Sequence, residues 1–150
     1  MSQSTDKVSW STTMAFGAPA IGAGYMYLIL ALYVMKFSTD VLLIAPVVMG
    51  AIFSLSRIWD AISDPLAGYL SDRTSGLLGR RRTWILASLI PIALGFYAVF
   101  APPAYLEQED LNLWMAIAIL GFYSAMTLFF VPHMALGAEL SDDYHERSQL

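Results

Sequence analysis

Four long apolar segments separated by short charged loops constrain this chain more than any other feature. They cover residues 14–36, 41–70, 83–101 and 112–137. Each is close to or above the roughly 20 residues that cross about 30 Å of hydrocarbon as a helix. Only 13% of the residues are charged, against about a quarter in a typical soluble domain. Because a segment in lipid must satisfy its own backbone hydrogen bonds, we predict an all-α membrane protein with four transmembrane helices.

The charged segments between the apolar ones predict how the chain is oriented. If the N-terminus is cytoplasmic, only Lys36 falls on the outer side, and the remaining basic residues of the loops and ends fall on the cytoplasmic side. These are Lys7, Arg73, Arg80, Arg81, Arg82 and Arg147. Positive charge accumulates in cytoplasmic loops, so we predict that the tail 1–13 and the segment 138–150 are both cytoplasmic. We expect the membrane to be the plasma (inner) membrane.

Four prolines fall inside the predicted spans, namely Pro19, Pro46, Pro91 and Pro132. A proline within a helix removes a hydrogen-bond donor and frees the carbonyl one turn earlier, which can kink the helix. Freed carbonyls are tolerated at membrane depth where neighbouring helices or a cavity satisfy them.

The second apolar segment carries three ionisable residues, Arg57, Asp60 and Asp64, well inside the span. At about 100° per residue, all three share one helix face. Each charge near the bilayer centre costs at least about 2.5–3.5 kcal/mol on insertion scales. That face must therefore look into protein or a water-filled cavity. Ionisable residues at this depth usually mark a functional site, and the alternative is a neutral network that only joins helices.

Two carboxylates and one guanidinium leave one negative charge to neutralise. Arg57 can pair with Asp60 one turn away, and a monovalent cation bound by Asp60 and Asp64 can balance the rest. Pro65 favours this arrangement because it frees the Ala61 carbonyl beside the acids. The coupling cation is then Na⁺ or H⁺. We predict no other cofactor or metal, and the absence of cysteine excludes thiolate sites.

A basic loop follows this helix and has a specific order of residues. It runs Gly68-Tyr69-Leu70-Ser71-Asp72-Arg73 and, after a short gap, Gly79-Arg80-Arg81-Arg82. Positive-inside placement by itself explains most of these arginines. The order, however, resembles the signature between helices two and three of the major facilitator superfamily.

Two further strings narrow the resemblance. The string R-I-W-D-A-I-S-D-P from Arg57 to Pro65 resembles the second helix of the glycoside–pentoside–hexuronide:cation symporters, the melibiose permease-like family. The run from Tyr25 to Leu28 is similar to that family, as is Asp40, expected to open the second helix. The resemblance implies a twelve-helix fold. On it, these four helices are the incomplete, N-terminal fragment of a transporter whose remaining eight helices are expected partners.

The resemblance also implies a site. Asp60 and Asp64 match the family's cation-binding acids. Ser63 and Thr127 stand at the positions of further cation ligands, and Arg57 is their charge partner. The implied function is the cation-coupled symport of a sugar or glycoside by a secondary active transporter, which is not an enzyme. Its partners are a small-molecule solute, a monovalent cation and the lipid bilayer, with no nucleic acid.

The predicted substrate cavity departs from the family pattern. Ala18, Phe130 and Met134 stand where the family's sugar-binding Asp, Asp and Trp are expected. Tyr25 and Tyr27 are further candidates to line the cavity. The apolar replacements favour a different glycoside, or an amphipathic solute such as a lysolipid, because lysophospholipid symporters share this branch.

A cytoplasmic gate is expected at the basic loop. Its residues are Gly68, Asp72, Arg73, Gly79, Arg80, Arg81 and Arg82. The acids Asp142, Asp143 and Glu146 lie on the same side of the membrane, and ion pairs between the two groups would latch the gate. A different hypothesis is a small four-helix membrane protein with a structural or regulatory role. An intramembrane enzyme lacks support, since the spans hold no nucleophile–base pair.

Overall fold

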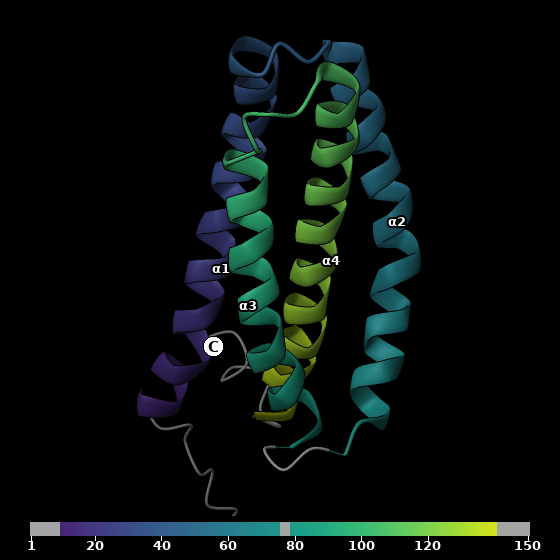
Figure 1. The fold of residues 1–150 in the computed structure, drawn as a ribbon. Helices are drawn as coiled ribbons and strands as arrows, with labels where there is room; N and C mark the ends of the chain where they lie inside the picture. The colour runs from purple at the N-terminus through teal and green to yellow at the C-terminus, as the bar shows by residue number, and fades with distance from the viewer. Residues whose placement is uncertain (1–9, 76–78, 141–150) are drawn as a thin grey trace, which may run out of the picture.

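The computed structural model describes residues 10–75 and 79–140, which form four helices and no strand. They are α1 (Trp10–Lys36), α2 (Pro46–Arg73), α3 (Arg80–Phe100) and α4 (Gln108–Leu140), with a short π-helical segment η1 (Phe37–Val41) after α1. The four helices run side by side along a common direction (Figure 1). The predicted all-α class is therefore confirmed.

Three segments are long and apolar enough to cross a membrane: Thr13–Val41, Arg80–Phe100 and Gln108–Ala138. The remaining helix, α2, has 28 residues. At about 1.5 Å per residue, its length exceeds the thickness of the hydrocarbon core. Its charged residues lower its mean hydropathy, so it does not qualify by composition. The face of α2 that carries Arg57, Asp60 and Asp64 therefore needs cover.

The second helix begins at Pro46 and not at residue 41, which corrects the predicted boundary. Leu43 adopts a φ of 56° and interrupts the helix, and Ala45 is extended, as residues before proline usually are. Pro46 is therefore a first-turn residue, where a missing N–H costs little, and not a kink inside a span. Asp40 lies in η1, where it pairs with Lys36, so it does not open the second helix.

The main core lies along α4, which packs against α3 on one side and α2 on the other (Figure 1). Met115, Ile119, Phe122 and Phe129 of α4 are fully buried. Gly95 allows the backbone of α3 to approach that of α4 closely, because a Cβ at this position would lie 3.0 Å from the Phe122 Cα.

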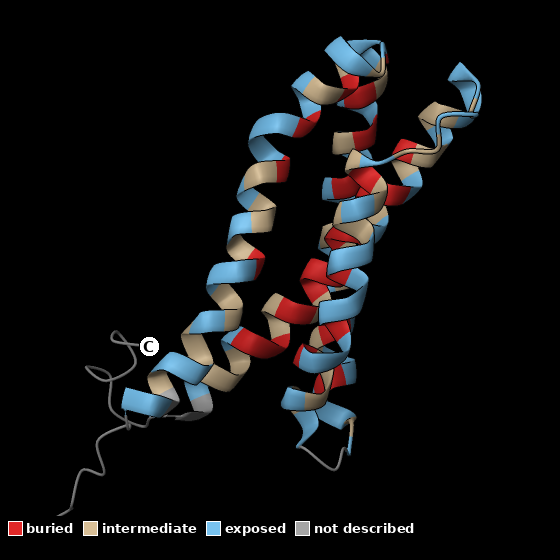
Figure 2. Ribbon diagram, turned by 60° about the vertical axis from the view of Figure 1, so that its left-hand side comes forward, coloured by how far each residue is buried: buried red, intermediate tan, exposed pale blue. Residues whose placement is uncertain are grey.

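The C-terminal half of α4 runs toward the N-terminal end of α1 (Figure 2). His133 is only 5% exposed there, and its ring stacks on Phe16 of α1, with 4.0 Å between ring centroids. It also stacks on Phe129 of α4, with 5.2 Å between ring centroids. Pro132, inside α4, precedes this contact. The aromatic stack therefore fixes α1 to a helix with which it otherwise makes few contacts.

Candidate functional site

The charged face of α2 opens into a cavity of about 340 Å³ that also involves α1 and α4. Its lining residues are Tyr27 of α1; Arg57, Asp60 and Asp64 of α2; and Tyr123, Met126, Thr127, Phe130 and Val131 of α4. Every ionisable residue predicted inside the second span therefore meets the same cavity. The packing of α2 against α4 places polar α4 residues opposite the acids.

Both terminal nitrogens of the Arg57 guanidinium form hydrogen bonds. Its Nη1 donates to Asp60 Oδ2 at 3.1 Å, which is the expected ion pair one turn along α2. Its Nη2 donates to the hydroxyls of Tyr123, at 3.1 Å, and Tyr27, at 3.4 Å. The guanidinium carbon also lies 4.8 Å from the centroid of the Tyr123 ring, within cation–π range. One guanidinium thus joins α1, α2 and α4.

The two carboxylates are left with unused acceptor capacity. Asp64 Oδ1 accepts a hydrogen bond from Thr127 Oγ1 at 2.9 Å. Within residues 10–75 and 79–140, Asp64 forms no ion pair with Arg57. Asp60 Oδ1 is buried and has no hydrogen-bond partner in that same part of the chain. These oxygens and the Thr127 hydroxyl are hard ligands of the kind that alkali cations take.

The other predicted cation ligand, Ser63, is placed differently. Its hydroxyl donates to the Asp60 carbonyl at 3.5 Å, and it is not among the residues that line the cavity. Nearby, Trp59 Nε1 donates to Ser124 Oγ at 2.7 Å, which adds a second link between α2 and α4.

The predicted substrate residues separate into two groups. Tyr27 and Phe130 line the cavity. Tyr25 is 64% exposed, Met134 is 71% exposed and Ala18 is exposed, and none of the three lines it. Sequence reasoning missed Tyr123, although its position one turn before Thr127 on the same helix could have indicated it.

The loop predicted as a gate joins three helix ends. Arg81 Nη2 donates to Asp72 Oδ1 at 3.0 Å, and Nη1 donates to the backbone carbonyl of Ala135 in α4. Arg73 lies over the ring of Tyr69, 4.1 Å from its centroid.

Glycines and a tryptophan complete this end of the bundle. Gly79, the residue before α3, has a φ of 95°, which favours glycine. A Cβ on Gly68 would contact Val131 of α4 at 3.6 Å. Trp84 Nε1 donates to Thr74 Oγ1 at 2.8 Å. Arg80 and Arg82 lie in the first turn of α3. The acids predicted to latch this loop, Asp142, Asp143 and Glu146, lie outside the described residues.

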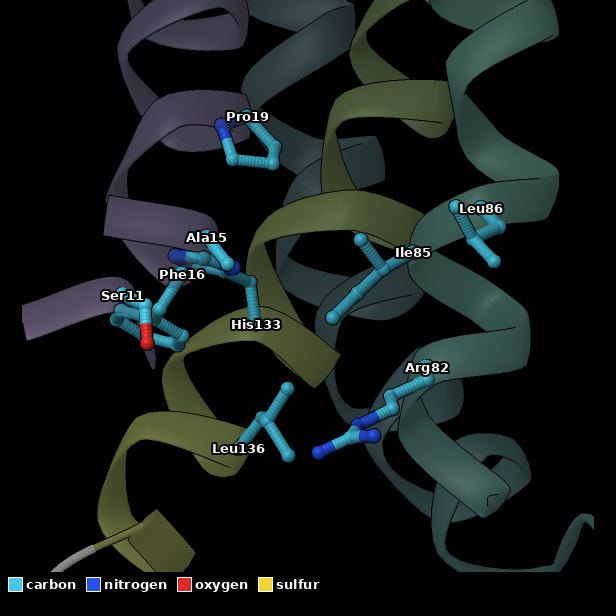
Figure 3. A pocket seen from close by; sticks show the side chains of 9 residues that line it. All are labelled: Ser11, Ala15, Phe16, Pro19, Arg82, Ile85, Leu86, His133 and Leu136. Carbon is cyan, nitrogen blue, oxygen red and sulfur yellow. The ribbon is translucent and has the colours of Figure 1, made fainter. Parts of the chain in front are cut away.

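A larger cavity of about 430 Å³ lies between α1, α3 and α4 (Figure 3). Phe16, Ile85 and Leu136 are among the residues that make its wall largely apolar, and Arg82 and His133 also line it. It holds no carboxylate among its lining residues. The smaller cavity therefore remains the candidate site, because of these two cavities it is the one that combines carboxylates with a guanidinium and hydroxyls.

Comparison with known proteins identifies the family. The family described as MFS/sugar transport protein matches residues 15–150. The chain belongs to this family. The resemblance to the major facilitator superfamily that the sequence suggested is therefore confirmed, and the chain is that of an integral membrane protein.

Relatives within this family are named as symporters, which are transporters and not enzymes. An uncharacterized symporter of Synechocystis sp. is 36% identical over 99% of this chain and 28% of its own length. The inner membrane symporter YicJ of Escherichia coli is 32% identical, over 79% of this chain and 26% of its own. The sodium-dependent lysophosphatidylcholine symporter 1-A of Danio rerio is 33% identical, over 79% and 22%. The chain thus spans less than a third of the length of these relatives.

Proposed function

We propose that this chain provides the cation site of a secondary active transporter that couples the entry of Na⁺ or H⁺ to the symport of a solute. One observation carries the proposal. Two acids share a cavity with a single guanidinium that also binds two tyrosines, so Asp64 has no cationic partner among the described residues. An uncompensated carboxylate inside a span is expensive, and a bound cation removes that cost.

Coupling follows from the same geometry. A cation held by Asp64, the free oxygen of Asp60 and the Thr127 hydroxyl would neutralise the cavity. A solute that binds better to the neutralised cavity would, by reciprocity, strengthen cation binding to the same extent. Ser63 would join the ligands only after its side chain turns away from the Asp60 carbonyl.

The solute we propose first is a sugar or glycoside, because the family is described as sugar transport proteins and the cavity offers tyrosine hydroxyls and charged groups. A lysolipid or similar amphipathic solute is the second candidate. Met126, Phe130 and Val131 give the α4 side of the cavity an apolar surface, and a relative is named for lysophosphatidylcholine.

The remaining helices of the full-length transporter would complete the substrate site, since major facilitator proteins bind substrate between two six-helix halves. We place the N-terminus and the Arg73–Arg82 loop on the cytoplasmic side of the plasma membrane, following the distribution of basic residues. Asp72 and Arg81 would then belong to the cytoplasmic gate.

The test is the substitution Asp64→Asn in the full-length protein, reconstituted in proteoliposomes. We expect cation-stimulated uptake to be abolished, while uptake driven by exchange of unlabelled solute is retained in part. Uptake is measured with NaCl against choline chloride, and across a pH gradient. The matched control is Asp40→Asn, since Asp40 pairs with Lys36 in η1 and does not line the cavity. Undiminished coupling in Asp64→Asn would exclude the proposed site.

A further inference from the structure

We propose that Tyr27 and Tyr123 are positioning residues that occupy one arm of Arg57 and thereby keep Asp60 Oδ1 and Asp64 open to the coupling cation. The inference rests on the proposed function and adds residues to it. Neither tyrosine is a cation ligand in this arrangement. Both act through the guanidinium.

The first observation is the geometry of the ion pair. Arginine and carboxylate groups frequently form two parallel hydrogen bonds. Here the pair has a single one, from Nη1 to Asp60 Oδ2, because Nη2 donates to Tyr123 and Tyr27 instead. The second oxygen of Asp60 is left buried and without a partner in the described part of the chain. An oxygen in that position is costly unless something binds it.

The second observation is that the two tyrosines form one unit from two helices. Their rings meet edge to face, with centroids 5.8 Å apart and planes at 79°. Tyr123 is only 3% exposed, so its position in α4 is set by packing. Arg57, by contrast, has a side chain that is 56% exposed and would otherwise be free to turn. The tyrosines therefore fix the orientation of the Arg57 guanidinium.

Removal of the hydroxyls has a definite consequence. A freed Nη2 can turn to the carboxylates of the same helix face, either to Asp60 Oδ1, on the carboxylate that Nη1 already holds, or to Asp64 about two helical turns from Arg57. Either contact would take a carboxylate oxygen that the cation needs. The cation would then compete with a guanidinium held in the same molecule, and its apparent affinity would fall.

The experiment uses Tyr27→Phe, Tyr123→Phe and the double variant of the full-length transporter in proteoliposomes. Phenylalanine keeps the ring and its packing and removes only the hydroxyl. We expect the half-saturating NaCl concentration to rise about tenfold in the double variant, as competition from one new hydrogen bond of ordinary strength between the guanidinium and a carboxylate would give. Both tyrosines line the cavity, so the readout is the NaCl dependence and not the maximal uptake rate. The control is Tyr97→Phe, an exposed tyrosine of α3.

A second background separates positioning from a direct role. In Arg57→Gln no guanidinium competes, so adding the two tyrosine substitutions should leave the half-saturating concentration unchanged. Because Arg57→Gln can impair transport itself, Na⁺ binding to the purified proteins is measured by calorimetry in parallel. An equal effect of the tyrosine substitutions in both backgrounds would overturn the inference, as would an unchanged NaCl dependence in the double variant.

Failure of this inference differs from failure of the proposed function. If Asp64→Asn abolishes coupling and the tyrosine variants titrate like the parent, only the positioning role is wrong. If the parent responds to pH and not to NaCl, the same variants are titrated with protons and the same shift is expected. If uptake depends on neither cation, the proposed function and the inference are both wrong.

Discussion

Among single residues, Thr127 is the one whose small side chain decides how Asp64 is presented. Its hydroxyl donates to Asp64 Oδ1 and the residue is buried, so it orients the carboxylate. A hydroxyl also has acceptor lone pairs. The Thr127 hydroxyl can therefore donate to Asp64 when no cation is bound and offer a lone pair to a cation that binds beside it.

This dual role predicts different outcomes for two substitutions. Thr127→Val keeps the shape and removes the hydroxyl, and we expect about a tenfold or greater rise in the half-saturating cation concentration, since hydrogen bonds to charged groups contribute roughly 1.5–3 kcal/mol. Thr127→Ser keeps the hydroxyl and should stay within about threefold, since a small packing loss below 1 kcal/mol is all that it removes. Cation titration of uptake measures both. Equal effects of Val and Ser would show that Thr127 acts by packing and not through its hydroxyl.

At the scale of elements, the close contact of α3 with α4 determines where the site residues of α4 stand. Without a side chain at Gly95 the two backbones approach until Phe122 fills the interface. Tyr123 follows directly in the chain and points to the other side, toward Arg57. A shift of α4 away from α3 would thus move the residues that face the cavity.

Two glycine-to-alanine substitutions test this packing with opposite expected signs. At Gly95 the new Cβ would lie 3.0 Å from backbone, so we expect a loss of roughly 1–3 kcal/mol in the free energy of unfolding. At Gly121 of α4 no atom lies within 4 Å, and the change should be neutral or stabilising by up to about 1 kcal/mol. Thermal unfolding of the purified full-length protein in detergent compares them. A Gly95→Ala variant as stable as Gly121→Ala would contradict the close contact.

For the molecule as a whole, Arg81 connects the ends of three helices on one side of the membrane. Its side chain is only 13% exposed and bonds both Asp72 at the end of α2 and the Ala135 carbonyl in α4. Arg82, the next residue, is exposed and lines the larger cavity. Two arginines of the same basic run thus have different structural roles.

Neutralising each arginine should show the difference. We expect Arg81→Gln to lower the free energy of unfolding by about 1–3 kcal/mol, because a polar carbonyl and a carboxylate lose their partner. Arg82→Gln should change it by no more than about 0.5 kcal/mol, as surface substitutions usually do. Denaturation of both variants is measured together with initial uptake rates. Equal destabilisation would mean that positive charge at this end matters and its position does not.

The helical class, the number of long helices and the charged face of α2 could all be predicted from the sequence. They depend on quantities local to the chain, namely apolar length, charge placement and a spacing of three or four residues. Helix ends were less predictable, because the φ of Leu43 depends on how the chain turns between α1 and α2. The preference of Pro46 for a first turn was readable, yet a proline in an apolar run looks the same as one within a span.

What the sequence by itself determined is which residues need partners: Arg57, Asp60 and Asp64 are too costly in a span to stand alone. Only the tertiary structure decided what those partners are. Tyr27 and Tyr123 come from helices far apart in the chain, and Asp64 is about two helical turns from Arg57 on the same face. Whether Arg57 pairs with one acid or with both depends on the tyrosine hydroxyls that accept hydrogen bonds from its Nη2. That choice is made by the packing of α1 and α4 around α2, which no spacing within one helix contains.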